Sequence, residues 1–264
     1  MRVAEIGDNC IDSYDRIGKK YPTGNVVDTG VNLKKLGVDV SIISTTGSDD
    51  NGKWMIESLK EEGLDISHLK VADGPTAVTH MDMNGNDRVH GEYVEGVLAN
   101  MVFDDEDIKF ASSHDLVHTA LWGMAEKTLP KIAANKTPIA FDYADRLDHP
   151  LVEETLPYVT YGFYSYHNGH DEFIENFLKD KVNRGMKIAI ATFGDQGSLA
   201  YDKDGFHKGN IVPAKEVVNT VGAGDSFIAG FLYGILNNYS VEDCLKKGAE
   251  VASKVVEVFE PWVK

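Results

Sequence analysis

The chain has 264 residues, 42% of them hydrophobic, a size and composition that fit one large domain with a well-packed core. Its 26 Lys and Arg residues stand against 42 Asp and Glu residues, which gives a formal net charge of −16 at pH 7. So acidic a surface argues against nucleic acid and against anionic membranes as partners. The longest apolar run, at 227–236, is too short to cross a bilayer.

The two cysteines, Cys10 and Cys244, are far apart in the sequence. In a chain of this size we expect free thiols in a reducing cytoplasm, with a disulfide between them as the alternative. The first ten residues read as a short strand and not as a signal peptide, which agrees with a cytoplasmic location.

Short apolar runs alternate with longer amphipathic runs along most of the chain. The runs expected to form buried strands are 2–7, 38–44, 114–122, 137–143 and 187–194. The runs expected to form helices are 24–36, 50–62, 125–134, 171–184, 222–236 and 241–258. This alternation predicts βαβ units, and therefore an α/β protein whose parallel sheet is covered by helices on both faces. We expect residues 1–264 to form a single domain.

Residues 76–96 interrupt this alternation. They read as two strands around Asn84-Gly85, a pair that favours a type I′ hairpin. An antiparallel hairpin inserted into an α/β chain predicts a small sheet beside the main one. Together with a segment near 12–18, this sheet is expected to form a lid over a ligand. The alternative is an edge hairpin without a function.

The stretch NTVGAGDSFIAGF, residues 219–231, contains one carboxylate among small and apolar residues. Gly222, Ala223 and Gly224 leave the backbone open where a helix is expected to start, and the amides of its first turn have no internal partners. Such a helix start binds anions, commonly phosphate. The adjacent Asp225 could take a proton from a hydroxyl while the amides stabilise a transferred phosphoryl group. The stretch therefore predicts a kinase centre, unless Asp225 only caps the helix.

Residues 220–227 also resemble the C-terminal signature of the ribokinase/PfkB-like sugar kinases, D-T-x-G-A-G-D-x-F. The resemblance implies a ribokinase-like fold, with a three-layer parallel-sheet core and a small antiparallel β lid. It implies ATP and Mg²⁺ as cofactors, Asp225 as the catalytic base, and an anion hole formed by Gly222, Ala223 and Gly224. Asn219 replaces the usual first aspartate, which leaves dependence on a monovalent cation open.

Two N-terminal segments resemble the substrate-binding part of the same family. In IGDNCID, the resemblance assigns Asp12 to the sugar hydroxyls, with Asn9 nearby; the alternative for Asp12 is a turn carboxylate. In TGNVVDTG, Gly24 and Asn25 match the family's segment, Thr23 replaces a glycine and Asp28 replaces an asparagine. The extra charge of Asp28 would suit a substrate that carries an amine. The alternative places Asp28 on a solvated helix face.

The segment ATFGDQGSLAY resembles the family's nucleotide loop, and it assigns Thr192, Gly194 and Gly197 to ATP. An ordinary glycine turn between strands is the alternative. Residues 246–256 would line one side of the adenine pocket; the alternative is that their small side chains serve helix packing. The family's magnesium motif is not clear, because Asn168 and Glu172 are wrongly spaced, so no metal ligand is assigned.

Several segments, including 86–96 and 115–123, are most similar to family members that act on Amadori products. This implies phosphorylation of a primary hydroxyl, with fructoselysine or another fructosamine phosphorylated at its 6-hydroxyl. Asn86, Asp87 and Arg88 would face the pocket, with Arg88 as the contact. Trp122 would line the same pocket or, as the preferred interpretation, lie in the core.

Two alternatives remain open. One is a ribose, fructose or nucleoside kinase of the same fold. The other is a sensor that binds a sugar or nucleotide without turnover. The resemblance also implies a homodimer formed through the β lid.

Overall fold

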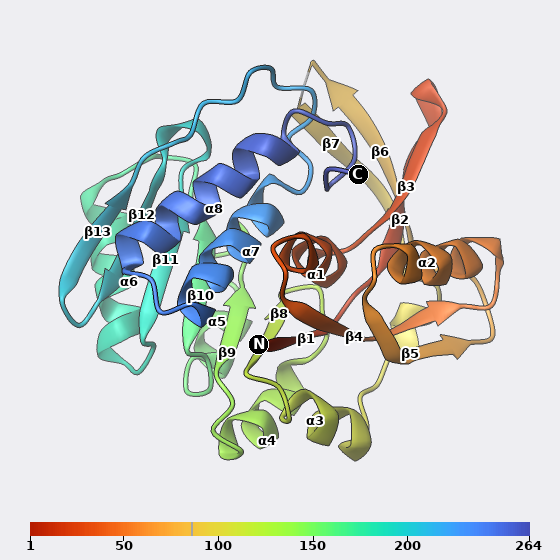
Figure 1. Cartoon of the computed structure of the whole chain (residues 1–264), viewed down its shortest axis with the longest axis horizontal. Coiled ribbons are helices and arrows are strands. Elements are labelled where there is room, and N and C mark those ends of the chain that lie inside the picture. Colours follow the sequence, from red (N-terminus) through yellow and green to blue (C-terminus); the bar gives the residue numbers. More distant parts are fainter. Residues whose placement is uncertain (86) are drawn as a thin grey trace.

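The computed structural model describes residues 1–85 and 87–264 (Figure 1). Asn86 and the side chain of Asp87, both expected beside the pocket, lie outside what it describes. The main sheet has the strand order β13-β12-β11-β10-β9-β8-β1-β4-β5. Its strands are β1 Arg2–Ile6, β4 Asp39–Gly47, β5 Asp65–Ala72, β8 Leu116–Ala120, β9 Ile139–Asp142, β10 Tyr161–Ser165, β11 Ile188–Thr192, β12 Ser198–Asp202 and β13 Gly205–Gly209. The strands from β5 to β11 in this order run parallel to one another. Strand β12 is antiparallel to β11, and β13 is antiparallel to β12.

Helices cover both faces of this sheet, so the predicted three-layer α/β architecture is confirmed. On one face, crossing Figure 1 in a row, lie α8 Val241–Val255, α7 Ala223–Leu236, α1 Asn25–Lys35 and α2 Asp50–Glu61. On the other face lie α3 Asp105–Ala111, α4 Leu129–Ala134, α5 Pro150–Thr155 and α6 Glu172–Asn183. Short 3₁₀ turns occupy Asp15–Ile17, Gly96–Asn100, Glu126–Thr128 and Gly194–Gln196.

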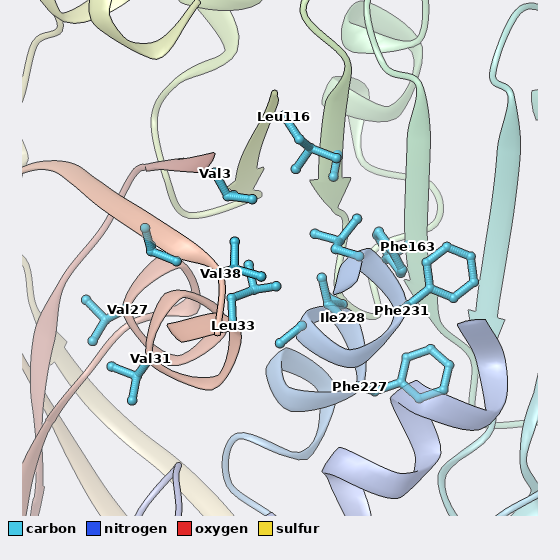
Figure 2. Close-up of a cluster of buried hydrophobic side chains, with 14 of the residues drawn as sticks. Val3, Val27, Val31, Leu33, Val38, Leu116, Phe163, Phe227, Ile228 and Phe231 are labelled. Carbon is cyan, nitrogen blue, oxygen red and sulfur yellow. The ribbon is translucent and has the colours of Figure 1, made fainter. Parts of the chain in front are cut away.

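The core divides along the sheet because side chains alternate between its two faces. On the α1–α7 face, apolar side chains of the strands meet those of the two helices (Figure 2). Phe163 of β10 and Phe231 of α7 pack edge to face, with ring centroids 5.4 Å apart. This packing holds the middle of α7 against the sheet.

A second, four-stranded sheet lies beside the main one, as residues 76–96 predicted. Its order is β3-β2-β6-β7, with β2 Cys10–Tyr14, β3 Lys19–Thr23, β6 Val78–Asn84 and β7 Asp87–Val94. Each hairpin is antiparallel, but the inner strands β2 and β6 run parallel, so the sheet is mixed.

The hairpin turn differs from the expected one. Asn84 pairs with Asp87, so Asn84 ends the strand and is not the first residue of the loop. Gly85 adopts a φ of 63°, the left-handed conformation that glycine accepts readily.

Three further expectations can be compared with the structure. Cys10 and Cys244 are both free and buried, so the free-thiol prediction is confirmed. The preferred interpretation of Trp122 as a core residue is wrong, because Trp122 is 53% exposed just after β8. Among the described residues, no helix has the length and apolar character needed to span a bilayer.

Candidate active site

The predicted site residues gather where the parallel strands end, the usual location of a ligand crevice in an α/β sheet. Asp8 and Asn9 follow β1, and Asp142 is the last residue of β9. The helices α1 and α7 both begin near this edge and pack against each other. The fold therefore brings residues 8–28 and 219–225 together, although about 200 residues of chain separate them.

The start of α7 leaves an open backbone, as an anion site requires. Gly222 adopts a left-handed φ of 69°, and a Cβ there would lie 2.7 Å from the carbonyl oxygen of Pro261. At Gly224, by contrast, an added Cβ would meet nothing within 4 Å. Within the described part of the chain, the amides of Gly224 and Asp225 have no hydrogen-bond acceptor. These amides and the space above Gly224 fit a phosphate group.

Asp225 lies in the first turn of α7 and is half-buried. Its Oδ1 accepts a hydrogen bond of 3.0 Å from Nδ2 of Asn25, and its main-chain oxygen accepts one of 3.5 Å from Oγ1 of Thr29. Burial, with the negative charge of Asp142 as a second cause, raises the pKa of Asp225 to about 7. A carboxylate with such a pKa is suited to accept a proton at neutral pH.

The start of α1 is held against the end of β1. Gly24 has a φ of 135°, and a Cβ there would lie 2.9 Å from both the Asp8 carbonyl oxygen and Cα of Asn9. The backbone amide of Asn25 donates to Oδ2 of Asp8 over 3.2 Å. The side-chain nitrogen of Asn9 donates to Ser44 Oγ and to a neighbouring main-chain oxygen, each over 2.7 Å. Gly24 and Asp8 therefore hold the backbone that presents Asn25, and Asn9 ties the end of β1 to β4.

Asp8 was not predicted as a site residue. Its Oδ1 is buried and has no hydrogen-bond partner in residues 1–85 and 87–264, and burial raises the pKa of this carboxyl group. The one signal in the sequence is its position directly after a buried strand, where side chains reach the ligand edge.

Asp28 is only 3% exposed, so the interpretation of a solvated helix face is wrong. Its Oδ2 accepts a hydrogen bond of 2.7 Å from Oγ1 of Thr23. The two departures from the family pattern, Thr23 and Asp28, are therefore partners in the structure. Burial, followed by the charge of Asp225, raises the pKa of Asp28 well above its ordinary value.

Asp12 lies within strand β2 and is buried, so it is not a turn carboxylate. Burial raises the pKa of Asp12 to about 7. The charge of Asp8 raises the pKa of both Asp12 and Asp28, and the charge of Asp225 also raises the pKa of Asp28. These three carboxyl groups therefore share one acidic neighbourhood with Asp225.

Asn219 supports the loop that precedes α7. Its Nδ2 donates to the main-chain oxygen of Phe259 over 2.9 Å, and its Oδ1 accepts from the amide of Val221 over 3.1 Å. An ionised aspartate could accept the second bond but could not donate the first. The replacement of the usual aspartate therefore serves to join this loop to the C-terminal segment.

Arg88 of β7 reaches the same loop. Its Nη1 donates to the main-chain oxygen of Thr220 over 2.8 Å, two residues before Gly222. Its positive charge also lowers the pKa values of Asp12 and Asp225 against the larger effect of burial. The second sheet is thus tied directly to the loop that precedes α7.

The expected nucleotide loop lies at the same edge, where Thr192 ends β11. Gly194 and Gly197 have φ values of 60° and 90°, and a Cβ on Gly197 would lie 2.3 Å from the Gly209 oxygen. Gly197 therefore allows β13 to approach, whether or not ATP binds there. No hydrogen bond joins this loop to Asp225 among the described residues.

Helix packing explains the small residues of the C-terminal helix. A Cβ on Gly248 of α8 would lie 2.8 Å from the Phe227 oxygen, and a Cβ on Gly230 of α7 would lie 2.6 Å from the Lys247 oxygen. These glycines allow α7 and α8 to pack closely.

The candidate magnesium region offers no ligand cluster. Asn168 is exposed and donates to the Tyr166 hydroxyl over 3.3 Å, and Glu172 is the first residue of α6. The described residues include no group of three or more His, Cys, Asp or Glu placed to hold a metal ion.

Comparison with known proteins agrees with this geometry. Residues 16–261 match the model of the pfkB family of carbohydrate kinases. The chain is 36% identical to fructoselysine 6-kinase of Escherichia coli strain K12, over 98% of this chain and 99% of that protein. It is 30% identical to a fructosamine kinase of Bacillus subtilis strain 168, over 98% of this chain and 92% of that protein.

Solved structures show the same fold. A nucleoside kinase of Methanocaldococcus jannaschii superposes with a TM-score of 0.80 at 24% identity, over 98% of this chain and 93% of that one. Arabidopsis thaliana ribokinase gives a TM-score of 0.81 at 20% identity, over 97% and 92% of the two chains. The fold is therefore ribokinase-like. The chain belongs to the pfkB family of carbohydrate kinases, and it is an ATP-dependent sugar kinase.

Proposed function

We propose that this kinase phosphorylates the primary 6-hydroxyl of a fructosamine such as fructoselysine. The observation that carries the chemistry is the position of Asp225, which is held by Asn25 beside the open amides of α7. The observation that favours a fructosamine is the acidic neighbourhood of Asp8, Asp12 and Asp28. The two fructosamine-directed relatives support the same substrate class.

In the proposed reaction, the Asp225 carboxylate accepts the proton of the substrate hydroxyl as its oxygen attacks the γ-phosphorus of ATP in line. Asn25 orients the carboxylate through its hydrogen bond. The amides of Gly224 and Asp225 stabilise negative charge on the transferred phosphoryl group. Magnesium, which neutralises phosphate charge in such reactions, would be held mainly by phosphate oxygens and water, since the described residues offer it no ligand cluster.

The remaining assignments are also part of this proposal. Asp12, Asn9, Gly24 and Asn25 would surround the sugar. Thr192, Gly194 and Gly197 would lie along the nucleotide. Arg88 would close the second sheet over the site through its bond to Thr220. Dependence on a monovalent cation stays open, and a cytoplasmic location stays a prediction.

Unpartnered atoms support an amine in the substrate. Within the described part of the chain, Oδ1 of Asp8, Oδ1 of Asn9 and Oδ1 of Asp28 are buried without a hydrogen-bond partner. All three are acceptors when the carboxyl groups are ionised, so the complementary ligand is a donor. The secondary ammonium of a fructosamine supplies two N–H donors and a positive charge. Ribose, fructose and adenosine lack that cation.

ADP release with magnesium and ATP tests this proposal on fructoselysine, fructose, ribose and adenosine. We expect turnover with fructoselysine and a preference for it over fructose. Asp28→Asn keeps the size of the side chain and removes its charge, so it should reduce that preference by about 10- to 100-fold. Equal turnover of fructose and fructoselysine would contradict the fructosamine assignment. Ligand binding without ADP release from any substrate would favour the sensor.

We further propose that the chain forms a homodimer through the second sheet. β7 is an edge strand of this sheet, and Val89, Tyr93 and Val94 expose apolar surface along it. Light scattering should give twice the mass of the 29.0 kDa chain. Val89→Lys should shift the measured mass toward that of the monomer. A monomeric wild type at micromolar concentration would exclude this dimer.

A further inference from the structure

A buried charged pair lies beneath the candidate active site. Glu5 of β1 and His118 of β8 are directly paired across adjacent strands. Oε2 of Glu5 lies 2.6 Å from Nδ1 of His118, and both side chains are 0% exposed. They share the face of Val3 and Leu116, which are two residues away on the same strands and belong to the core under α1 and α7.

Stability alone does not account for this pair. Oε1 of Glu5 and Nε2 of His118 are both buried and have no hydrogen-bond partner among the residues that the structure describes. A buried ion pair with incomplete hydrogen bonding is commonly no more stable than apolar side chains of the same size. The neighbouring side chains on this face of the sheet are apolar, so apolar residues would fit at these two positions. The pair therefore points to an electrostatic role.

The contacts around the pair lead to Asp225. Above Glu5 lies Gly30 of α1, where an added Cβ would be 3.2 Å from Cγ of Glu5. The preceding residue, Thr29, donates to the main-chain oxygen of Asp225. Along the sheet, His118 pairs with Ala140 of β9, and Asp142 follows two residues later on the same face.

Nearby carboxylates act on both members of the pair. Burial by itself would lower the pKa of His118, but the charges of Glu5, Asp142 and Asp225 outweigh it and raise that pKa. Burial raises the pKa of Glu5, the charge and hydrogen bond of His118 oppose this rise, and the charge of Asp8 adds to it. The charges of Asp142 and Asp225 therefore favour the imidazolium form of His118.

We propose that His118 is a positioning residue that Glu5 holds in its imidazolium form, and that the positive charge of His118 favours the ionised form of Asp225. The proposal rests on the role of Asp225 as the base. Asp142 and Asp28 oppose ionisation of Asp225, and Arg88 of the second sheet favours it. Arg88 is exposed, whereas the charge of His118 acts from a buried position and is less screened by solvent.

Reciprocal coupling gives a test that needs no substrate. If the charge of His118 lowers the pKa of Asp225, then the charge of Asp225 must raise the pKa of His118 by the same amount. NMR titration of the histidine Cε1–H signals should show His118 above the ordinary value of 6.5 in the wild type. Its pKa should fall by about one unit in Asp225→Asn. The signal is assigned by its loss in His118→Asn.

An unchanged His118 pKa in Asp225→Asn would overturn the inference, and so would a His118 that stays neutral across the titration. His114 is the internal control, because it is also buried but both of its ring nitrogens have partners, Phe110 O at 2.9 Å and Ser41 Oγ at 3.0 Å. Its titration should be the same in both proteins.

Kinetics with fructoselysine supplies the second readout. Glu5→Gln removes the charge that holds the imidazolium, so the acidic limb of kcat should move up by about one pH unit. His114→Asn should leave the acidic limb of kcat at the same pH as in the wild type. The double variant Glu5→Leu/His118→Leu replaces the pair by apolar side chains, so the test remains available if Glu5→Gln folds poorly. Its acidic limb of kcat should move up by the same amount.

The two proposals can fail separately. An active Asp225→Asn enzyme would remove the proposed base and with it this inference. An inactive Asp225→Asn enzyme, together with an unshifted acidic limb in the double variant, would refute the role of His118 alone.

Discussion

Replacing Asn25 by alanine should change the pH at which the kinase works. The side chain of Asn25 donates one hydrogen bond of 3.0 Å to Oδ1 of Asp225, and that bond lowers the pKa of the carboxyl group. A hydrogen bond to a charged group contributes about 1.5–3 kcal/mol. Its loss corresponds to a rise of about 1–2 units from the present pKa of about 7.

The size of the effect at pH 7 follows from this rise. At a pKa of about 7, roughly half of Asp225 is ionised, and at a pKa of about 8–9 only about 1–10% is ionised. The kcat of Asn25→Ala should therefore fall about 5- to 50-fold at pH 7 and recover as the pH is raised above the new pKa. The assay is ADP release with saturating ATP and substrate from pH 5.5 to about 9.5. Asn135→Ala, on the exposed end of α4, is the matched control. A kcat that falls equally at every pH, with its midpoint unchanged, would refute the reasoning.

Three further substitutions test the framework of the site. Gly222→Ala forces a left-handed residue against the Pro261 oxygen, so it should lower both activity and the melting temperature in thermal unfolding. Gly224→Ala meets no atom within 4 Å, so it should leave the melting temperature unchanged but raise KM for ATP by blocking the open amides; an unchanged KM would contradict the anion site. Phe231→Ala removes a fully buried ring and should lower the free energy of unfolding in urea by about 3–5 kcal/mol, whereas a loss below about 1 kcal/mol would contradict the packing in Figure 2.

Local patterns predicted much of the fold. Buried strands and amphipathic helices alternate because each βαβ unit buries both faces of its strand, so strands such as β1 and β4 could be located from apolar runs alone. The boundaries were less certain. The last helix was expected to reach Val258 but ends at Val255, since apolar residues beyond it pack in an irregular segment.

The site was predicted where one motif carries its own chemistry, and missed where the chemistry depends on distant partners. Asp225 and Gly224 stand together in the sequence, so an anion site could be inferred. The bond between Thr23 and Asp28 could not be inferred, because each was seen only as a departure from a family pattern. Glu5 and His118 are 113 residues apart and lie in apolar strands, so only the strand register brings them together.

Asp225→Asn offers the most direct test of the proposed reaction. This variant keeps the size of the side chain and its contact with Asn25 but cannot accept a proton. With fructoselysine, ATP and magnesium, the account predicts that kcat for ADP release falls by about 10²–10⁴-fold while ATP still binds. Turnover by Asp225→Asn at the rate of the wild type would contradict the central claim that this carboxylate is the catalytic base.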